Sequence, residues 1–236
     1  MKNIISLFVF VSSLSLSAQT DLTGAWQSGS DENRSTMIIA GKFFSVAVYN
    51  TREKTYTGTY GGLWHIEKNH FIEIQEFNTM KPELIGIEQS AEIKIQKDKL
   101  TFKAGNVNQE FTRIDTGKPG ELSGAWLITG RMTEKGIEKR TPGARKTMKI
   151  LSGSRFQWIA YNNETKEFFG TGGGTYTASG GKYIESIEFF SRDNSRVGAN
   201  LEFDFSLVDG DWRHRGKSSK GDPIDEIWSK REKIGI

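Results

Sequence analysis

The chain of 236 residues contains no cysteine, carries a formal net charge of +3 and has 36% hydrophobic and 11% aromatic residues. The lack of cysteine excludes disulfides, thiol catalysis and thiolate metal sites, and the mild charge argues against a nucleic-acid-binding protein. The apolar and aromatic content predicts a folded core rather than a disordered chain.

The N-terminal residues 1–18 have the three parts of a secretory signal peptide. Lys2 is followed by an apolar stretch over 4–16 and then by small residues up to Ala18. This stretch is shorter than the about 20 residues that a membrane-spanning helix needs. We therefore expect a secreted or periplasmic protein, cleaved after Ala18 or alternatively after Ser17, with no integral membrane segment after cleavage.

The rest of the sequence is an internal repeat. LTGAW at 22–26 recurs as LSGAW at 122–126, and GTYGG at 58–62 recurs as GTGGG at 170–174. The GAW motifs lie 100 residues apart, whereas the glycine-rich segments and all that we align after them lie 112 apart. The second copy has therefore gained about a dozen residues near its start.

The repeat divides the chain into two domains of similar size. We assign residues 20–114 to the first repeat and 121–233 to the second, with DTGKPG at 115–120 as a linker rich in turn formers. The added segment of the second copy, 129–146, is rich in Lys and Arg. We expect a solvated loop there or, alternatively, a lid or a lip for an anionic ligand.

Strands are predicted through most of both copies. Stretches rich in β-branched and aromatic residues, bounded by Gly, Asn, Asp or Lys, lie at 43–49, 70–77, 91–96, 99–104, 155–161, 183–190 and 201–207. Only 80–90 is expected to hold a turn of helix. Roughly eight strands per copy, joined in sequential hairpins, predict an all-β fold of two tandem antiparallel barrels. The paired glycines then mark bulges, bends or close backbone contacts rather than a phosphate site.

The GAW motif carries a family resemblance. Gly24-Ala25-Trp26 opens the first copy, and Phe111-Thr112-Arg113 lies in its last strand. This pair resembles the lipocalin-like (calycin) barrels, in which a G-x-W tryptophan packs near the barrel base beneath an arginine from the final strand. In the second copy Gly124-Ala125-Trp126 is intact, with Lys230 or Arg231 near the expected place.

A second motif supports the same resemblance. GTGGGTY followed by KYIESIEFF is similar to lipocalin-like domains of unknown function in secreted bacterial proteins. The resemblance implies a closed or nearly closed barrel with an interior pocket, and it implies no one reaction.

Strand alternation identifies a candidate interior face. It groups Phe71, Glu73, Gln75 and Phe77 in the first copy, and Tyr183, Glu185, Ile187 and Phe189 in the second. Aromatic residues flank the glutamate on this face in both copies, so we expect it to be the interior. A buried carboxyl group has a raised pKa and is a candidate general acid or ligand partner. The alternative is a glutamate that only bonds a neighbouring Tyr, Arg or amide.

The candidate site residues follow from this face and from the aromatic residues near it. Those expected to bind a ligand are Glu185, Tyr183, Tyr176, Trp158, Glu73, Trp64 and Tyr60, and the catalytic candidates are Glu185 and Glu73. Glu73 and Glu76 are three apart, so they face opposite sides of a strand and do not form a pair of catalytic carboxylates. The three histidines, His65, His70 and His214, lack the spacing of zinc ligands, and no metal or cofactor is expected.

These observations predict a binding protein that holds a small amphipathic or anionic molecule in a barrel pocket, preferably in the second copy, which has Trp158 and the basic insert. An enzyme that uses the pocket glutamate as acid or base is an alternative. A structural or interaction module of the cell envelope is another, and it would have packed barrel interiors.

Overall fold

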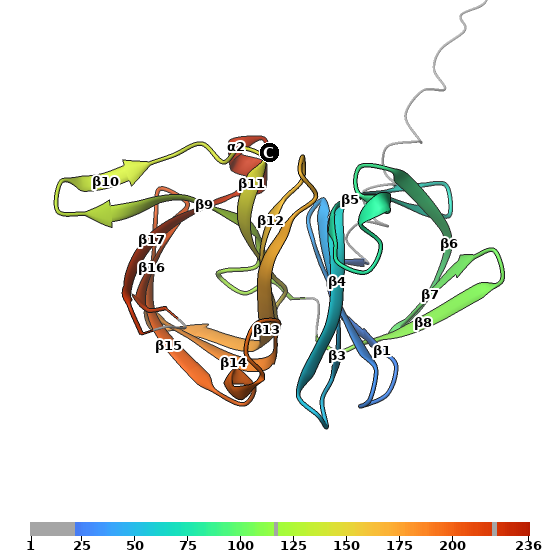
Figure 1. Cartoon of the computed structure of the whole chain (residues 1–236). Helices are drawn as coiled ribbons and strands as arrows, with labels where there is room; N and C mark the ends of the chain where they lie inside the picture. The colour runs from blue at the N-terminus through green and yellow to red at the C-terminus, as the bar shows by residue number, and fades with distance from the viewer. Residues whose placement is uncertain (1–21, 116–117, 219–220) are drawn as a thin grey trace, which may run out of the picture.

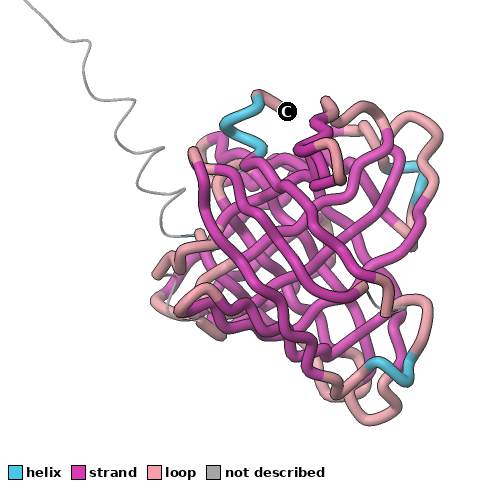
Figure 2. The backbone as a smooth tube through the Cα atoms, turned by 90° about the vertical axis from the view of Figure 1, so that its left-hand side faces the viewer, coloured by secondary structure: helices cyan, strands magenta, loops and turns pink. Residues whose placement is uncertain are grey.

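The computed structural model describes residues 22–115, 118–218 and 221–236. The expected signal peptide and residues 116 and 117 of the expected linker lie outside them. Two β-barrels stand side by side (Figure 1), which confirms the predicted all-β fold. Most of the described backbone is strand, with loops and a few short helical segments at the barrel ends (Figure 2). None of the helices in the described residues has the length and apolar character to cross a membrane.

The first barrel is closed and has eight antiparallel strands in chain order. They are β1 (Gly24–Ser28), β2 (Arg34–Ala40), β3 (Phe43–Asn50), β4 (Thr55–Glu67), β5 (His70–Asn78), β6 (Glu88–Gln96), β7 (Lys99–Ala104) and β8 (Val107–Arg113). Pairing of β1 with β8, with Trp26 opposite Arg113, closes the barrel. The expected helical turn between β5 and β6 is the 3-10 helix η1 (Pro82–Leu84).

The second barrel repeats this order and is closed by the pairing of its last strand, β17, with its first, β9. Its elements are β9 (Gly124–Thr133), β10 (Gly136–Lys139), β11 (Arg145–Leu151), β12 (Arg155–Asn162), β13 (Phe168–Ser179), β14 (Lys182–Phe190), η2 (Asn194–Arg196), β15 (Asn200–Val208), β16 (Asp211–Lys217), β17 (Pro223–Lys230) and α2 (Arg231–Ile234). The segment 129–146, expected as a loop or lid, instead extends β9 and pairs it with β10 in a projecting hairpin (Figure 1).

The repeated glycines mark β-bulges and close backbone contacts, as predicted. The register of β4 against β5 shifts between Gly61 and Gly62, and β13 shifts at the matching place against β14. A Cβ atom on Gly61 would lie 2.4 Å from the carbonyl oxygen of Phe44, and one on Gly173 would lie 2.5 Å from that of Phe156. No larger residue fits there without movement of the backbone, so the motif serves geometry.

These bulges overturn part of the expected strand alternation. Glu76 in β5 and Glu188 in β14 are the extra residues, each skipped in the pairing with the neighbouring strand. Phe77 and Phe189 were expected inside the barrels, with Glu73 and Glu185 respectively, and instead pack outside, between the barrels. The physical reason is that an extra residue reverses the side-chain alternation beyond it.

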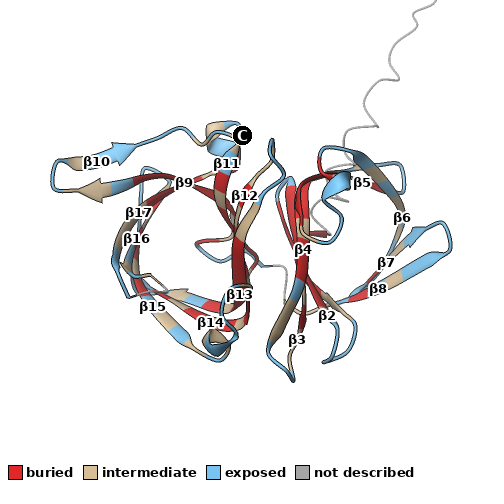
Figure 3. Cartoon of the chain, in the orientation of Figure 1, coloured by how far each residue is buried: buried red, intermediate tan, exposed pale blue. Residues whose placement is uncertain are grey.

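A continuous apolar contact joins the two barrels, and the strands are most buried where the barrels meet (Figure 3). The contact consists of Ile38, Ala40, Phe43 and Phe77 from the first barrel and Ala125, Leu127, Met148, Ile150, Ile159 and Tyr161 from the second. Each barrel has a separate apolar interior. The outward faces of these strands are therefore buried as fully as the inward faces.

Candidate functional site: a cavity in the first barrel

The first barrel holds a cavity of about 240 Å³ that is partly open to solvent. Most of its wall is apolar, and the polar groups are a carboxylic acid, three amides and two hydroxyls. The lining residues are Met37, Phe44, Val46, Tyr60, Phe71, Glu73, Gln75, Leu84, Gln89, Ser90, Ala91, Phe102, Ala104, Val107, Gln109 and Phe111. An apolar enclosure with a few polar groups is the usual composition of a small-molecule site.

Trp26 closes one end of this barrel. The Arg113 guanidinium lies 4.0 Å from the centroid of the Trp26 ring and donates a hydrogen bond of 2.7 Å to the carbonyl of Thr23. The Trp26 indole donates to the carbonyl of Leu22 at 2.8 Å. A fully buried indole with its N–H satisfied and a cation on its face makes a rigid floor below the cavity.

The second barrel has the same floor with a different cation. The Trp126 indole donates to the carbonyl of Leu122 at 2.8 Å, and the ammonium of Lys230 lies 5.2 Å from the Trp126 ring. Of the two residues that the sequence left open for this place, Lys230 occupies it, and Arg231 turns away to the contact between the barrels.

Glu73 is the charged residue of the cavity wall. Gln75 donates a hydrogen bond of 2.7 Å to Glu73 Oε1, and Asn78 donates to Gln75 at 2.7 Å. Burial raises the pKa of Glu73, although the Gln75 hydrogen bond opposes part of that effect. Tyr60, also in the wall, has its pKa raised by burial and by the nearby Glu73. Among the described residues no cation pairs with Glu73.

In the second barrel the equivalent glutamate does have a cation. Glu185 Oε1 accepts a hydrogen bond of 2.7 Å from Lys149 Nζ, and both side chains are buried. The ammonium is surrounded by four aromatic rings, whose centroids lie at 4.9 Å (Tyr183), 5.5 Å (Phe203), 5.1 Å (Trp212) and 5.4 Å (Trp228). The lysine and its aromatic cage fill the centre of this barrel.

The structure places the seven expected binding residues in two different settings. Tyr60 and Glu73 line the cavity of the first barrel. Trp64 is not a lining residue and stacks behind the lining residue Phe71, with ring centroids 5.0 Å apart. The other four lie in the packed interior of the second barrel: Tyr176, Tyr183, Glu185 and Trp158.

Two of these four have fixed contacts of their own. Tyr176 donates a hydrogen bond of 2.6 Å to the carbonyl of Ser152, and burial raises its pKa to about 12. Trp158 packs edge-to-face against Phe190 and fills the space above Gly172, where a Cβ atom would lie 2.7 Å from the indole nitrogen. The first barrel has Val46 and Tyr60 at the matching positions, so the small and large residues are exchanged.

Sequence reasoning missed Lys149. The signal was present, because a lysine at the centre of the apolar strand TMKIL shares the inward face with Thr147 and Leu151. Continuing the 112-residue offset into this strand places Lys149 on Met37. A lysine on an inward face predicts a buried carboxylate partner, and Glu185 is that partner.

The added hairpin of the second copy borders a groove of about 580 Å³ at the mouth of the second barrel. Its charged lining residues are Arg131, Lys139, Arg140, Glu138, Asp225 and Glu226. Arg131 pairs with Glu138 at 3.2 Å, and Asp225 pairs with Arg213 at 2.6 Å. Since basic and acidic groups balance, this groove does not select anions by charge.

Comparison with protein-family models gives no match, and comparison with curated proteins gives none either. Within the described ranges, no three His, Asp or Glu side chains are grouped for a metal ion. The cavity of the first barrel therefore stands on its own geometry as the candidate site.

Proposed function

We propose that this is an exported binding protein of the lipocalin-like type that holds a small amphipathic molecule inside its first barrel. The observation that carries the proposal is the cavity of about 240 Å³ with an aromatic wall and one carboxyl group. The signal-peptide pattern of residues 1–18 supports export, and the repeated G-x-W floor supports the lipocalin-like assignment.

The packing of the two interiors supports the first barrel as the binding barrel. Ala91 in the first barrel occupies the position of Phe203 in the second. Phe203 pairs with Tyr183 of the preceding strand, and Ala91 pairs with Phe71, the residue that matches Tyr183. Leu100 likewise replaces Trp212. Smaller residues in the first barrel leave the space that larger rings fill in the second.

The charges of the wall favour an amphipathic ligand over an anionic one. Glu73 is the charged lining residue, and an anion brought beside its carboxylate in a partly desolvated cavity would be repelled. The apolar wall would enclose the body of the ligand, and Glu73 and the amides of Gln89 and Gln109 would orient its polar end.

The test is native mass spectrometry of the protein purified from its own cells, followed by denaturation and identification of any released molecule. Ala91→Phe copies the second barrel and fills the cavity, so it should remove the bound mass. Val208→Phe adds the same ring at a side chain that is 60% exposed on β15 and should leave the bound mass unchanged. A bare wild-type protein in repeated preparations, or a bound mass that Ala91→Phe retains, would contradict the proposal.

A further inference from the structure

One inward-facing strand position carries a different side chain in each of the two barrels. Met37 pairs with Trp26 on one side and Val46 on the other. Lys149 pairs with Trp126 and Trp158, the residues at the matching positions of the second copy. Met37 and Lys149 therefore occupy equivalent places in the two barrels.

The second barrel shows what this place accommodates. The Lys149 ammonium is buried, hydrogen-bonded to Glu185 at 2.7 Å and enclosed by four rings. A buried ammonium needs a carboxylate partner and gains further stabilisation from ring faces within about 6 Å. The barrel interior is thus built to bind an alkylammonium group, which the chain itself supplies.

The first barrel keeps the carboxyl group and two of the four ring positions of these surroundings, without the ammonium. The residues at the positions of Lys149, Glu185, Tyr183, Phe203 and Trp228 are Met37, Glu73, Phe71, Ala91 and Phe111, and all five line the cavity. The carboxyl group is retained, two aromatic positions are retained, and the space lies beside them. What is missing is the cation.

Resting on the binding function proposed above, we propose that the ligand of the first barrel carries a protonated amine that pairs with Glu73. The ligand's ammonium would take the place that Lys149 takes in the second barrel, and its apolar part would lie against Phe44, Phe71 and Phe102. Pairing with a cation also offsets the cost of a buried carboxylate, of which the Gln75 hydrogen bond otherwise compensates a part.

Isothermal titration calorimetry with three compounds of equal chain length tests this proposal: n-hexylammonium, hexan-1-ol and hexanoate. Hexylammonium should bind most tightly and hexanoate most weakly. Glu73→Gln is nearly isosteric and should weaken hexylammonium about 10- to 100-fold, the effect of losing a charge-assisted hydrogen bond, with little change for hexan-1-ol.

Met37→Lys is the second variant, because it copies the second barrel. Its ammonium should pair with Glu73 and abolish hexylammonium binding, whereas the control Val208→Lys, which adds the same ammonium at an exposed side chain outside the cavity, should retain it. Hexylammonium affinity of the wild type should rise with pH as Glu73 loses its proton, since the other titratable group of the wall, Tyr60, has its pKa raised and stays neutral.

Equal affinities for hexylammonium and hexan-1-ol, no binding of hexylammonium, or the same hexylammonium affinity in Glu73→Gln and the wild type would overturn the ammonium assignment. The binding function is tested separately. A neutral or acidic molecule that is released from the native protein and lost in Ala91→Phe would support the binding function and contradict the ammonium assignment.

Discussion

Tyr49 of the first barrel donates a hydrogen bond to Glu188 of the second at 2.8 Å. Tyr161 of the second barrel returns the same contact to Glu76 of the first at 2.9 Å. Each tyrosine and each glutamate lies 112 residues from its counterpart, so the contacts are exchanged between equivalent positions. Reciprocal contacts of this kind define the interface of a two-fold symmetric dimer. The chain is therefore arranged as such a dimer joined into one polypeptide.

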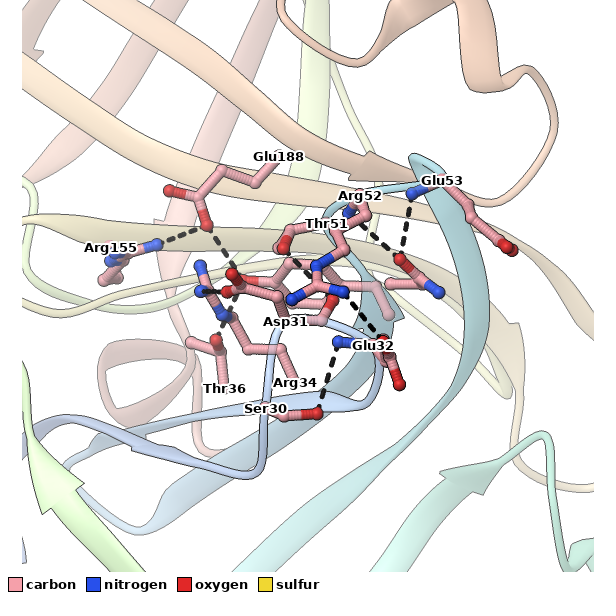
Figure 4. Close-up of polar contacts among 12 residues, drawn as sticks. Ser30, Asp31, Glu32, Arg34, Thr36, Thr51, Arg52, Glu53, Arg155 and Glu188 are labelled. Carbon is pink, nitrogen blue, oxygen red and sulfur yellow. Dashed lines mark hydrogen bonds and ion pairs between the residues drawn. The ribbon is translucent and has the colours of Figure 1, made fainter.

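The two glutamates differ in the cation that neutralises them. Arg155 pairs with Glu188 at 2.6 Å, beside the polar cluster at the start of β2 (Figure 4). Phe43 occupies the position of Arg155 in the first barrel, and Glu76 is bound instead by Arg231 through two hydrogen bonds of 2.6 and 2.9 Å. The Arg231 guanidinium lies 3.9 Å from the centroid of the Phe43 ring. The C-terminus of the chain thus completes the interface.

Replacing Arg231 with Met should destabilise the protein strongly. The side chain is 1% exposed, and its loss would leave Glu76 buried without its cation, at a cost of about 3–5 kcal/mol. Arg155→Met is the matched control and should cost about 1 kcal/mol, because that pair is partly exposed and Glu188 keeps the Tyr49 hydrogen bond. Urea unfolding measures both, and equal losses would contradict the assignment of Arg231 as the buried partner.

Local patterns were sufficient to predict the strands, the two barrels and the inward direction of Glu73 and Glu185. The outward packing of Phe77 and Phe189 was not predictable from alternation alone, because it depends on which residue of β5 and β14 the bulge skips. The repeated glycines indicate a bulge but do not specify that residue.

The contents of the barrels depended on residues far apart in the chain. The sequence favoured the second barrel for binding because it carries Trp158 and a basic insert. Whether an interior is open depends on the sum of many side-chain volumes. The decisive differences are that the first barrel has Ala91 where the second has Phe203, and Leu100 where the second has Trp212, and they lie in strands outside the repeated motifs. Alignment of the repeats through every strand would have exposed them.

Gly173→Ala should destabilise the second barrel. Its Cβ atom would lie 2.5 Å from the carbonyl oxygen of Phe156 and 2.6 Å from the ring of Phe189, so strands must separate at a cost of about 1–3 kcal/mol or more. Gly143→Ala is the control, because its Cβ atom would meet no atom within 4 Å. A thermal unfolding midpoint for Gly173→Ala equal to that of the control would show that the close contact is not needed.

The equivalent substitutions Glu73→Gln and Glu185→Gln should differ in their effects on stability at pH 7. Glu185→Gln strands the buried Lys149 ammonium and should cost about 3–5 kcal/mol. Glu73→Gln removes a carboxyl group whose pKa is raised by burial, so it should maintain or raise stability above the usual carboxyl pKa of 4.5 and lose that advantage below it. Urea unfolding of the two variants and the wild type at pH 7 and below pH 4.5 measures these effects. Similar losses of stability in the two variants would show that Glu73 has a cation partner.

His214→Phe should make stability less sensitive to mild acid. Burial lowers the pKa of His214 below its usual 6.5, and the Lys149 ammonium lowers it further, while the Glu226 carboxylate at 3.3 Å opposes both effects. Because the unfolded chain binds the histidine proton more readily than the folded chain does, the stability from a neutral His214 is complete above pH 6.5 and declines as the pH falls below it. Phe copies Phe102 of the first barrel and does not titrate. Glu73 titrates in both proteins, so the comparison isolates His214: urea midpoints between pH 7 and about 5 should decrease relative to the pH 7 value by more in the wild type than in the variant. Parallel curves would rule out His214 as a source of acid sensitivity.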